Sequence, residues 1–365
     1  MNSRKPDKIL IIKLWAIGEV ALATPCIAGL ASAFPGAEIS FLVGRRAMDI
    51  VSANRAISRV FPVDEDIFLR PSPARLLSLI KRLRREKFDL AVTLHHAAHF
   101  SFFAVLIGAR QRIGLRRPGS LSFNTADIVS DGATGPKIFD YLNVLKLLPV
   151  PVAPQDARIS VETDESDAMR VDALMKEGGL RDKRFVVLSC TGGENPAASR
   201  MRSNVPNKVW PPDYYRRLCD LILDGSEYKV AVVGGEGEVR RAASIAGEGR
   251  PRAVDLTGRM NLREVRILAE KALLSVTNDS GPLHVLSAAP SPVIAIFGPT
   301  DPSLICAPSG NIHIMREEME CSPCYDGKTF PNMVRECGYA SCMRAVTPEK
   351  VFKKICEIAE KGGKS

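Results

Sequence analysis

The residues best suited to acid–base chemistry follow the first apolar run of the chain. Lys13 lies at the end of that run, KILIIKL, and Gly18 and Glu19 stand where the next helical pattern begins. Glycine lets a ligand approach the backbone closely, and a carboxylate in such an exposed turn can take a proton from a substrate hydroxyl. The same carboxylate could instead only complement the dipole of the helix that starts there.

A second polar segment, 277–284, reads TNDSGPLH and lies between a strand-like run and a helical pattern. Asp279 and Ser280 are suitable helix caps, and a proline suits the first helical turn. Unpaired N–H groups at a helix start bind anions such as a diphosphate, and Gly281 leaves room for one. We expect His284 one turn inside this helix, directed toward the same end.

Three further segments extend this candidate anion site. Lys208, in the stretch KVWPP before another helical pattern, can reach a phosphate. The segments GGEGE at 234–238 and FGPTDP at 297–302 also follow strand-like runs. Together these turns predict a nucleotide-sized site. Each alone is also compatible with ordinary turn chemistry, and Lys208 alone with a surface lysine.

Four cysteines near the C-terminus form the pattern C-x2-C followed by C-x4-C. They are Cys321, Cys324, Cys337 and Cys342. Four thiolates at such spacing can hold zinc or iron, and the surrounding segment has little periodicity of its own. The sequence therefore predicts a structural metal site, with four reduced thiols in a loop as the alternative.

Alternating strands and helices must position these residues. Apolar runs predict strands at 8–14, 37–43, 59–63, 88–93, 184–189, 229–233, 253–256, 273–277 and 292–297. Helical periodicity predicts helices at 20–34, 73–85, 100–107, 138–148, 212–223, 238–246, 262–271, 282–289 and 348–361. Strands that alternate with helices indicate βα units and parallel sheets.

A proline-rich stretch at 149–154 divides this pattern into two halves. We expect an N-terminal domain over residues 1–152 and a C-terminal domain over 153–365, the latter with the cysteine-rich segment 321–342 and a final helix. Each half reads as a Rossmann-like domain, and two parallel sheets would face a central cleft.

Composition and charge narrow the class of protein. The 365 residues are 45% hydrophobic and 25% charged, which is typical of globular proteins. All of the net charge of +9 falls in residues 1–150, which carry 21 Lys+Arg against 12 Asp+Glu. That excess predicts an anionic partner for the first half, or else a solvated basic helix. Histidines interrupt the longest apolar stretch, and the N-terminus lacks a cleavage site, so we expect a cytoplasmic protein.

The chain resembles glycosyltransferase family 9, the ADP-heptose:lipopolysaccharide heptosyltransferases, along nearly its whole length. The resemblance is carried by residues 9–37, by KVWP at 208–211 and by the run 277–302. It implies a GT-B fold, with the acceptor on the N-terminal domain and the nucleotide-sugar on the C-terminal one. It also implies inverting transfer of a heptose to the anionic inner core (lipid A/Kdo) of lipopolysaccharide, at the inner membrane face.

The resemblance also assigns roles to individual residues. Glu19 stands where the family's catalytic acid is usually Asp, and Lys13 and Gly18 match the segment before it. Lys208 matches the lysine that approaches the nucleotide phosphates. The nucleotide-sugar motif is matched by Asp279, Ser280, Gly281 and His284. No cofactor is expected for catalysis, because no Asp-x-Asp pair is placed at the cleft for a divalent ion.

Other functions remain open from the sequence alone. A GT-B enzyme could use another nucleotide-sugar donor or a protein acceptor. A non-enzymatic anion-binding module could use the basic half on nucleic acid, although few aromatic residues lie among the charges. An NAD enzyme is disfavoured because the G-x-G-x-x-G fingerprint is missing.

Overall fold

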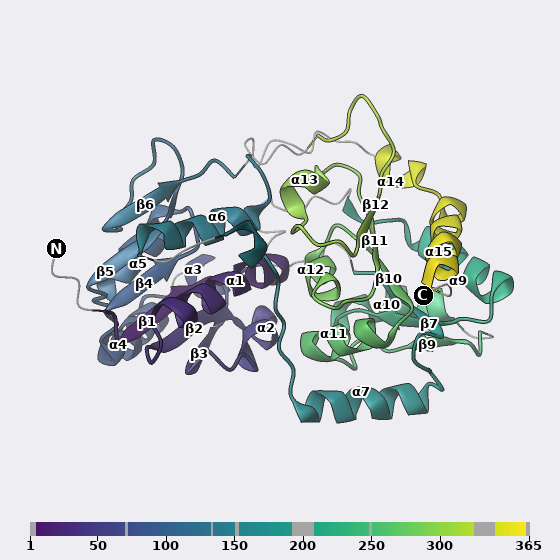
Figure 1. The fold of residues 1–365 in the computed structure, drawn as a ribbon, viewed down its shortest axis with the longest axis horizontal. Helices are drawn as coiled ribbons and strands as arrows, with labels where there is room; N and C mark the ends of the chain where they lie inside the picture. Colours follow the sequence, from purple (N-terminus) through teal and green to yellow (C-terminus); the bar gives the residue numbers. More distant parts are fainter. Residues whose placement is uncertain are drawn as a thin grey trace. The chain divides into compact units, whose positions relative to one another are not determined.

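The computed structural model describes residues 5–69, 72–132, 134–149, 153–191, 208–247, 250–324 and 340–362. The chain divides into two compact units, Met1–Glu162 (unit 1) and Thr163–Ser365 (unit 2). Figure 1 labels their elements. No helix among the described residues is long and apolar enough to cross a membrane.

Unit 1 is a parallel sheet with helices on both faces. Its strands are β1 Lys8–Ile12, β2 Glu38–Gly44, β3 Arg59–Val63, β4 Leu90–Thr93, β5 Gln111–Arg116 and β6 Ala126–Val129. Its α-helices are α1 Ile17–Ala33, α2 Asp49–Ser52, α3 Asp66–Leu69, α4 Pro73–Glu86, α5 Ala98–Leu106 and α6 Lys137–Val144. Short 3-10 turns occupy Arg45–Ala47, Leu145–Leu147 and Pro154–Asp156.

Unit 2 repeats this architecture. Its strands are β7 Phe185–Ser189, β8 Lys229–Val233, β9 Ala253–Asp255, β10 Leu274–Asn278, β11 Val293–Ile296 and β12 Ile312–Met315. Its α-helices are α7 Glu165–Glu177, α9 Pro212–Gly225, α10 Val239–Ala246, α11 Leu262–Lys271, α12 Gly281–Ser287, α13 Pro302–Ile305, α14 Ser341–Ala345 and α15 Pro348–Gly362. A 3-10 turn covers Glu236–Glu238, and α15 packs on α9.

Both sheets have the same strand order. Unit 1 runs β3-β2-β1-β4-β5-β6, and unit 2 runs β12-β11-β10-β7-β8-β9. In each sheet the direction of winding reverses between two central strands, β1 and β4 in one, β7 and β10 in the other. Ligands of doubly wound sheets bind at the carboxyl ends of the strands beside such a reversal. The fold therefore points to one candidate site in each unit.

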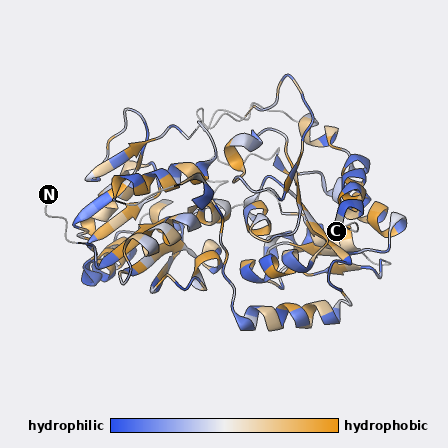
Figure 2. Ribbon diagram, in the orientation of Figure 1, coloured by the Kyte–Doolittle hydropathy of each residue, from blue (hydrophilic) through white to orange (hydrophobic). Residues whose placement is uncertain are grey.

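Buried aliphatic strands form the core of each unit. In β1, Leu10 and Ile12 pack with Phe100 and Phe103 of α5, while the alternate residues point to the opposite face. In unit 2, Val186 and Leu188 of β7 lie in one cluster with residues of α9, α10 and α15. Figure 2 shows the strands mostly in orange and α4 mostly in blue, as expected for a basic surface helix.

The structure contains elements that periodicity did not predict, namely the strands β5, β6 and β12, the helix α7 and the short helices α2, α3, α13 and α14. β5 reads QRIGLR and buries only its three central residues, while β6 and β12 have four residues each. Such short or charged strands are set by pairing with a neighbour rather than by local pattern. α7 has Asp164 as its N-cap residue, whose side chain accepts a hydrogen bond from the Asp167 N–H.

Candidate active site

In unit 1, the chain that follows β1 is held between two neighbouring strands. The Lys13 N–H donates to the Leu42 carbonyl at 3.1 Å, and the Leu14 N–H donates to His95 Nε2 at 3.0 Å. Because His95 follows β4, the chain leaves the sheet at the winding reversal. Lys13 is nearly fully buried at this point.

Glu19 lies in the first turn of α1 and is bound by three side chains. Its Oε2 accepts from Lys13 Nζ at 2.7 Å and from the Tyr141 hydroxyl, and its Oε1 accepts from Lys137 Nζ at 2.5 Å. Lys13 Nζ also donates to the Leu94 carbonyl at 3.1 Å. The Glu19 side chain is 27% exposed, so it is more buried than the exposed turn expected from the sequence. A role limited to the helix dipole does not account for these bonds.

Lys137 and Tyr141 were not identified from the sequence. They lie four residues apart on α6, and therefore on one face of it, and α6 packs on α1. The Tyr141 ring also lies under Lys13, whose Nζ is 4.8 Å from the ring centroid. The K-x3-Y spacing at a helix start was the available signal, but nothing local connects it to Glu19.

The charges in this cluster determine the ionisation of Glu19. Burial raises the pKa of the Glu19 carboxyl, but Lys13 and Lys137 outweigh this effect and hold the pKa well below its usual range. Burial lowers the pKa of Lys13, and the nearby Glu19 carboxylate partly offsets that shift. Glu19 is therefore a carboxylate at neutral pH and can accept a proton.

Two histidines after β4 border the same cluster, although the sequence marked them only as interruptions of an apolar stretch. Burial and the charge of Lys13 lower the pKa of His95 well below its usual range, and its ring stacks on Phe100. Burial lowers the pKa of His96 to about 4, and the charge of Lys13 is the second cause of this shift. The buried Nε2 of His96 has no hydrogen-bond partner in the described part of the chain. A neutral imidazole there can hydrogen-bond a polar ligand.

In unit 2, polar side chains meet at the ends of β7 and β10. The hydroxyl oxygens of Thr191 and Ser280 are 3.1 Å apart, and those of Thr191 and Ser189 are 3.3 Å apart. The Tyr215 hydroxyl contacts the Ser189 carbonyl at 3.0 Å and Asn278 Oδ1 at 2.9 Å. Ser280 is the N-cap residue of α12, as expected, although its side chain makes no capping hydrogen bond.

Three of the predicted nucleotide-site residues lie close together here. Lys208 Nζ is 2.7 Å from Asp279 Oδ2, which also accepts from the Thr300 hydroxyl at 2.6 Å. Burial raises the pKa of Asp279, but Lys208 outweighs it and the pKa is lowered. His284 is buried in α12, and its charge interacts with Asp279. Gly281 is the first residue of that helix.

The glycine-rich turn after β8 lies along the same edge of the sheet. The Gly235 N–H donates to Glu238 Oε2 at 2.9 Å, and the Gly258 N–H to the Gly234 carbonyl at 2.9 Å. Arg241 of α10 donates to the Cys190 carbonyl at 3.0 Å, which places a cation beside the end of β7. Arg241 was not identified from the sequence, because its position depends on α10 packing near β8.

The cysteine-rich segment is only partly described. Cys321 and Cys324 are exposed and Cys342 is buried, while Cys337 lies outside the described residues. The Cys324 N–H donates to the Pro299 carbonyl at 3.0 Å. A Cβ on Gly298 would lie 2.9 Å from the Cys342 Sγ, so both cysteines adjoin the turn after β11. No group of three or more metal-ligating side chains occurs among the described residues.

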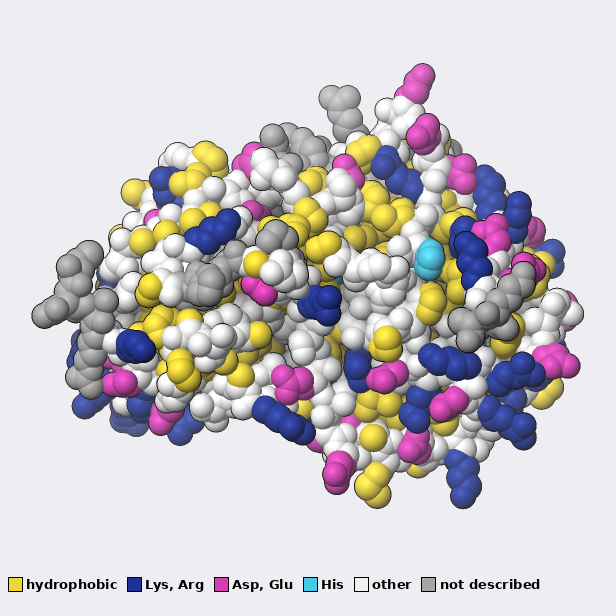
Figure 3. Space-filling view, in the orientation of Figure 1, with side chains coloured by type: hydrophobic (Ala, Val, Ile, Leu, Met, Phe, Trp, Pro, Cys, Tyr) yellow, Lys and Arg dark blue, Asp and Glu magenta, His cyan; other side chains and the backbone are white. Residues whose placement is uncertain are grey.

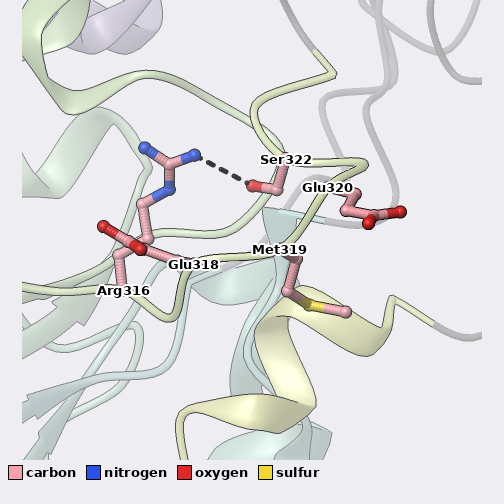
Figure 4. A pocket seen from close by; sticks show the side chains of 5 residues that line it. All are labelled: Arg316, Glu318, Met319, Glu320 and Ser322. Atoms are coloured by element: carbon pink, nitrogen blue, oxygen red, sulfur yellow. Dashed lines mark hydrogen bonds between the residues drawn. The ribbon is translucent and has the colours of Figure 1, made fainter.

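A pocket of about 690 Å³ adjoins this turn. Figure 4 shows its side chains, with Arg316 directed toward Ser322 and Glu320 lying on the far side of the loop. Arg316 Nη2 donates to Ser322 Oγ at 3.3 Å, and that hydroxyl donates to the Gly298 carbonyl at 2.5 Å. Glu318 and Met319 complete the lining, so the pocket is formed by the segment that follows β12.

Comparison with known proteins identifies the class. Two doubly wound units with polar sites at their winding reversals are the architecture of GT-B glycosyltransferases. The model of glycosyltransferase family 9 (heptosyltransferase) matches residues 76–333. The chain belongs to this family, and it is a glycosyltransferase.

Individual relatives agree with this assignment. Lipooligosaccharide heptosyltransferase 2 of Haemophilus influenzae is 27% identical over 293 residues, which cover 76% of this chain and 78% of the relative. A family 9 glycosyltransferase from Veillonella parvula has a similar fold, with a TM-score of 0.77, 22% identity and 97% of both chains covered. The ADP-heptose lps heptosyltransferase II of E. coli gives a TM-score of 0.74 at 20% identity, with 98% of this chain and 99% of that chain covered.

Proposed function

We propose that the protein transfers a heptose from ADP-heptose to the inner core of lipopolysaccharide. Membership of family 9 and the names of the relatives support the donor and the acceptor. The observation that carries the proposal is the ionised Glu19 carboxylate, held by Lys13, Lys137 and Tyr141 at the winding reversal of unit 1.

Glu19 acts as the general base in this proposal. It removes the proton of the acceptor hydroxyl, whose oxygen attacks the anomeric carbon of the heptose. The bond from that carbon to the diphosphate oxygen breaks, and ADP leaves with inversion at the sugar. Lys13, Lys137 and Tyr141 position the carboxylate, and Nε2 of His96, which has no partner among the described residues, hydrogen-bonds the acceptor.

The donor site is assigned to the ends of β7 and β10 in unit 2. The N–H groups at the start of α12, near Gly281, take the diphosphate, and Lys208 exchanges its bond to Asp279 for one to phosphate. His284 and Ser280 line the same site. These N–H groups and Lys208 then stabilise the negative charge of the departing diphosphate without having to rearrange.

Selective nucleotide binding tests the donor assignment. Thermal-shift screening against ADP, UDP, GDP and NAD should show stabilisation by ADP alone. Gly281→Val should weaken ADP binding strongly by calorimetry, and His284→Ala should weaken it less because the N–H groups remain. Unchanged ADP affinity in a folded Gly281→Val protein would place the nucleotide elsewhere, and the turn at 234–238 is the next candidate.

The activity itself is tested with ADP-heptose and a lipopolysaccharide-core acceptor lacking the heptose. We expect ADP release coupled to a mass increase of one heptose on the acceptor. ADP-heptose that is never consumed, or consumed equally without acceptor, would contradict the proposal. We place the reaction at the inner membrane face, where such an acceptor is anchored; the excess of basic residues in the first half supports this location.

A structural metal is a separate proposal for unit 2. Cys321, Cys324 and Cys342, together with Cys337, would hold zinc or iron. Its support is the cysteine spacing and the meeting of two of these cysteines at the turn after β11. Elemental analysis of anaerobically purified protein should find about one zinc or iron per chain. No metal there, or an equal amount in a Cys321→Ser/Cys324→Ser protein, would exclude it.

A further inference from the structure

One surface of unit 1 is apolar where a polar surface is expected. α5 reads AHFSFFAVL, and it buries Phe100 and Phe103 on one side while exposing Phe102 and Val105 on the other. The connection from β5 to β6 continues this surface with Phe123 and with Leu121, which is 75% exposed. A helix at a protein surface normally carries polar residues on its outer side. Exposed apolar patches of this kind mark interaction sites.

The patch is held in a fixed shape. The rings of Phe102 and Phe123 lie 5.1 Å apart. The Phe123 N–H donates to Ser101 Oγ at 3.0 Å, and Arg112 Nε donates to the Phe123 carbonyl at 3.0 Å. Asn124 Nδ2 donates to Asp127 Oδ1 at 2.7 Å. The apolar side chains are therefore presented outward by an anchored loop.

Cations lie beside this patch. Exposed basic residues follow one another along α4, which packs on α5, and another directly follows β5; they are Lys81, Arg82, Arg84, Arg85 and Arg117. None of them forms an ion pair with an acidic residue of the described chain. Arg84 reaches the end of α5, since its Cγ is 3.7 Å from where a Cβ on Gly108 would be. Figure 3 shows dark blue side chains in the region where Figure 1 places α4.

We propose that this surface, formed by Phe102, Val105, Leu121 and Phe123 with the basic residues of α4 and Arg117, docks unit 1 onto an anionic phospholipid bilayer. The apolar side chains enter the acyl boundary, and the exposed cations meet lipid phosphates. Exposed apolar side chains beside an excess of cations are the pattern by which proteins bind the interface of anionic bilayers. The inference deepens the proposed function and rests on it in one respect, that the acceptor is lipid-anchored.

The position of the surface suits such an acceptor. Arg117 directly follows β5, whose carboxyl end lies on the same edge of the sheet as those of β1 and β4. Glu19 and His96 stand at that edge, and the charge of Arg117 acts on His96. The face that includes Arg117 therefore reaches the edge of the sheet that holds the proposed base.

Vesicle flotation with the full-length protein tests the proposal. The wild-type protein should float with phosphatidylglycerol/phosphatidylethanolamine vesicles and remain behind with phosphatidylcholine vesicles, and added salt should weaken flotation. Leu121→Ser/Phe123→Ser should reduce the bound fraction about tenfold, and Arg84→Glu/Arg85→Glu should reduce it on anionic vesicles. Met169→Ser is the matched control, because Met169 is an apolar residue of α7 that is 72% exposed in unit 2.

Several results would overturn the inference. The inference fails if the wild-type protein does not float with anionic vesicles, or if the patch variants float like the wild type. It also fails if the patch instead mediates a concentration-dependent dimer. Transfer to a delipidated, soluble acceptor should be unchanged in the patch variants. Flotation without any transfer would contradict the proposed function alone, whereas transfer without flotation would contradict the docking surface alone.

Discussion

Glu19→Gln offers a test of the base and of the ion cluster at once. The change removes the charge that compensates Lys13, whose side chain is 4% exposed, and leaves an amide oxygen in its place. If Glu19 is the base, kcat/KM should fall about 10²–10⁴-fold. A folded variant with near-normal turnover would leave Glu19 a structural role only.

The stability change can be worked out from the burial of Lys13. An uncompensated buried ammonium can always lose its proton, and for an ordinary lysine pKa this limits the penalty to roughly 4.6 kcal/mol at pH 7. The Leu94 carbonyl and the new amide oxygen still accept from Lys13 and reduce it further. We therefore expect the free energy of unfolding to fall by about 1–4 kcal/mol.

The pH dependence distinguishes this cause from a packing defect. Burial lowers the pKa of Lys13 in the native protein, and loss of Glu19 removes an interaction that raises it. The unfolded chain then binds more protons than the native chain below the ordinary lysine pKa, so stability rises with pH up to that point. The difference in unfolding free energy between the wild type and Glu19→Gln should therefore shrink by about 1–3 kcal/mol between pH 7 and pH 9.

Urea unfolding followed by Trp15 emission measures this quantity for unit 1. The chain has 2 tryptophans, so a Trp210→Phe background leaves Trp15 as the sole reporter. The double variant Lys13→Met/Glu19→Gln is the control, since the buried Lys13 ammonium is removed and the remaining Lys137 side chain is 33% exposed. The loss of unfolding free energy in the double variant should therefore depend little on pH. If Glu19→Gln loses the same unfolding free energy at pH 7 and at pH 9, the reasoning is refuted.

Three other substitutions probe the remaining contacts. Tyr141→Phe removes one hydrogen bond to the proposed base and should lower kcat about tenfold without changing the circular dichroism spectrum; an unchanged kcat would show that the hydroxyl is dispensable. Lys208→Met should raise the calorimetric Kd for ADP about tenfold or more, while Lys208→Arg keeps most of the affinity; equal values for all three proteins would exclude a phosphate contact. Gly298→Ala places a methyl group 2.5 Å from Met343 Sδ and should cost about 1–3 kcal/mol; a thermal midpoint equal to that of wild type would show that the turn moves aside.

The strands and helices that local pattern defines were predictable from the sequence. β8 and α11 have the predicted bounds, 229–233 and 262–271, because a buried aliphatic run and a capped amphipathic helix each carry their own signal. The convergence of the turns after β8, β10 and β11 on one edge was predictable as well, since parallel strands end on the same side of a sheet. The fold class and the enzyme class are confirmed.

Contacts between residues that are distant in the chain were not predictable. Lys137 lies 118 residues from Glu19, and Tyr141 lies 122 residues from it. Their meeting depends on α6 packing against α1, which leaves no trace in the spacing of either segment. The same holds for Asp279, which reads as a helix cap but binds Lys208 and Thr300 instead.

The shared strand order of the two units has a consequence for how the chain is made. In each sheet the first strand pairs with the fourth, so this pairing forms only after the fourth strand has been made. Ile9 pairs with Leu90 in unit 1, and Val186 pairs with Leu274 in unit 2. Translation delivers the N-terminal partner first, and domains generally fold as units during synthesis. Unit 1 has all six of its strands once Val129 has been made, before any strand of unit 2 exists. The half of the enzyme that carries the proposed base can therefore fold while the ribosome is still making the half assigned to the nucleotide.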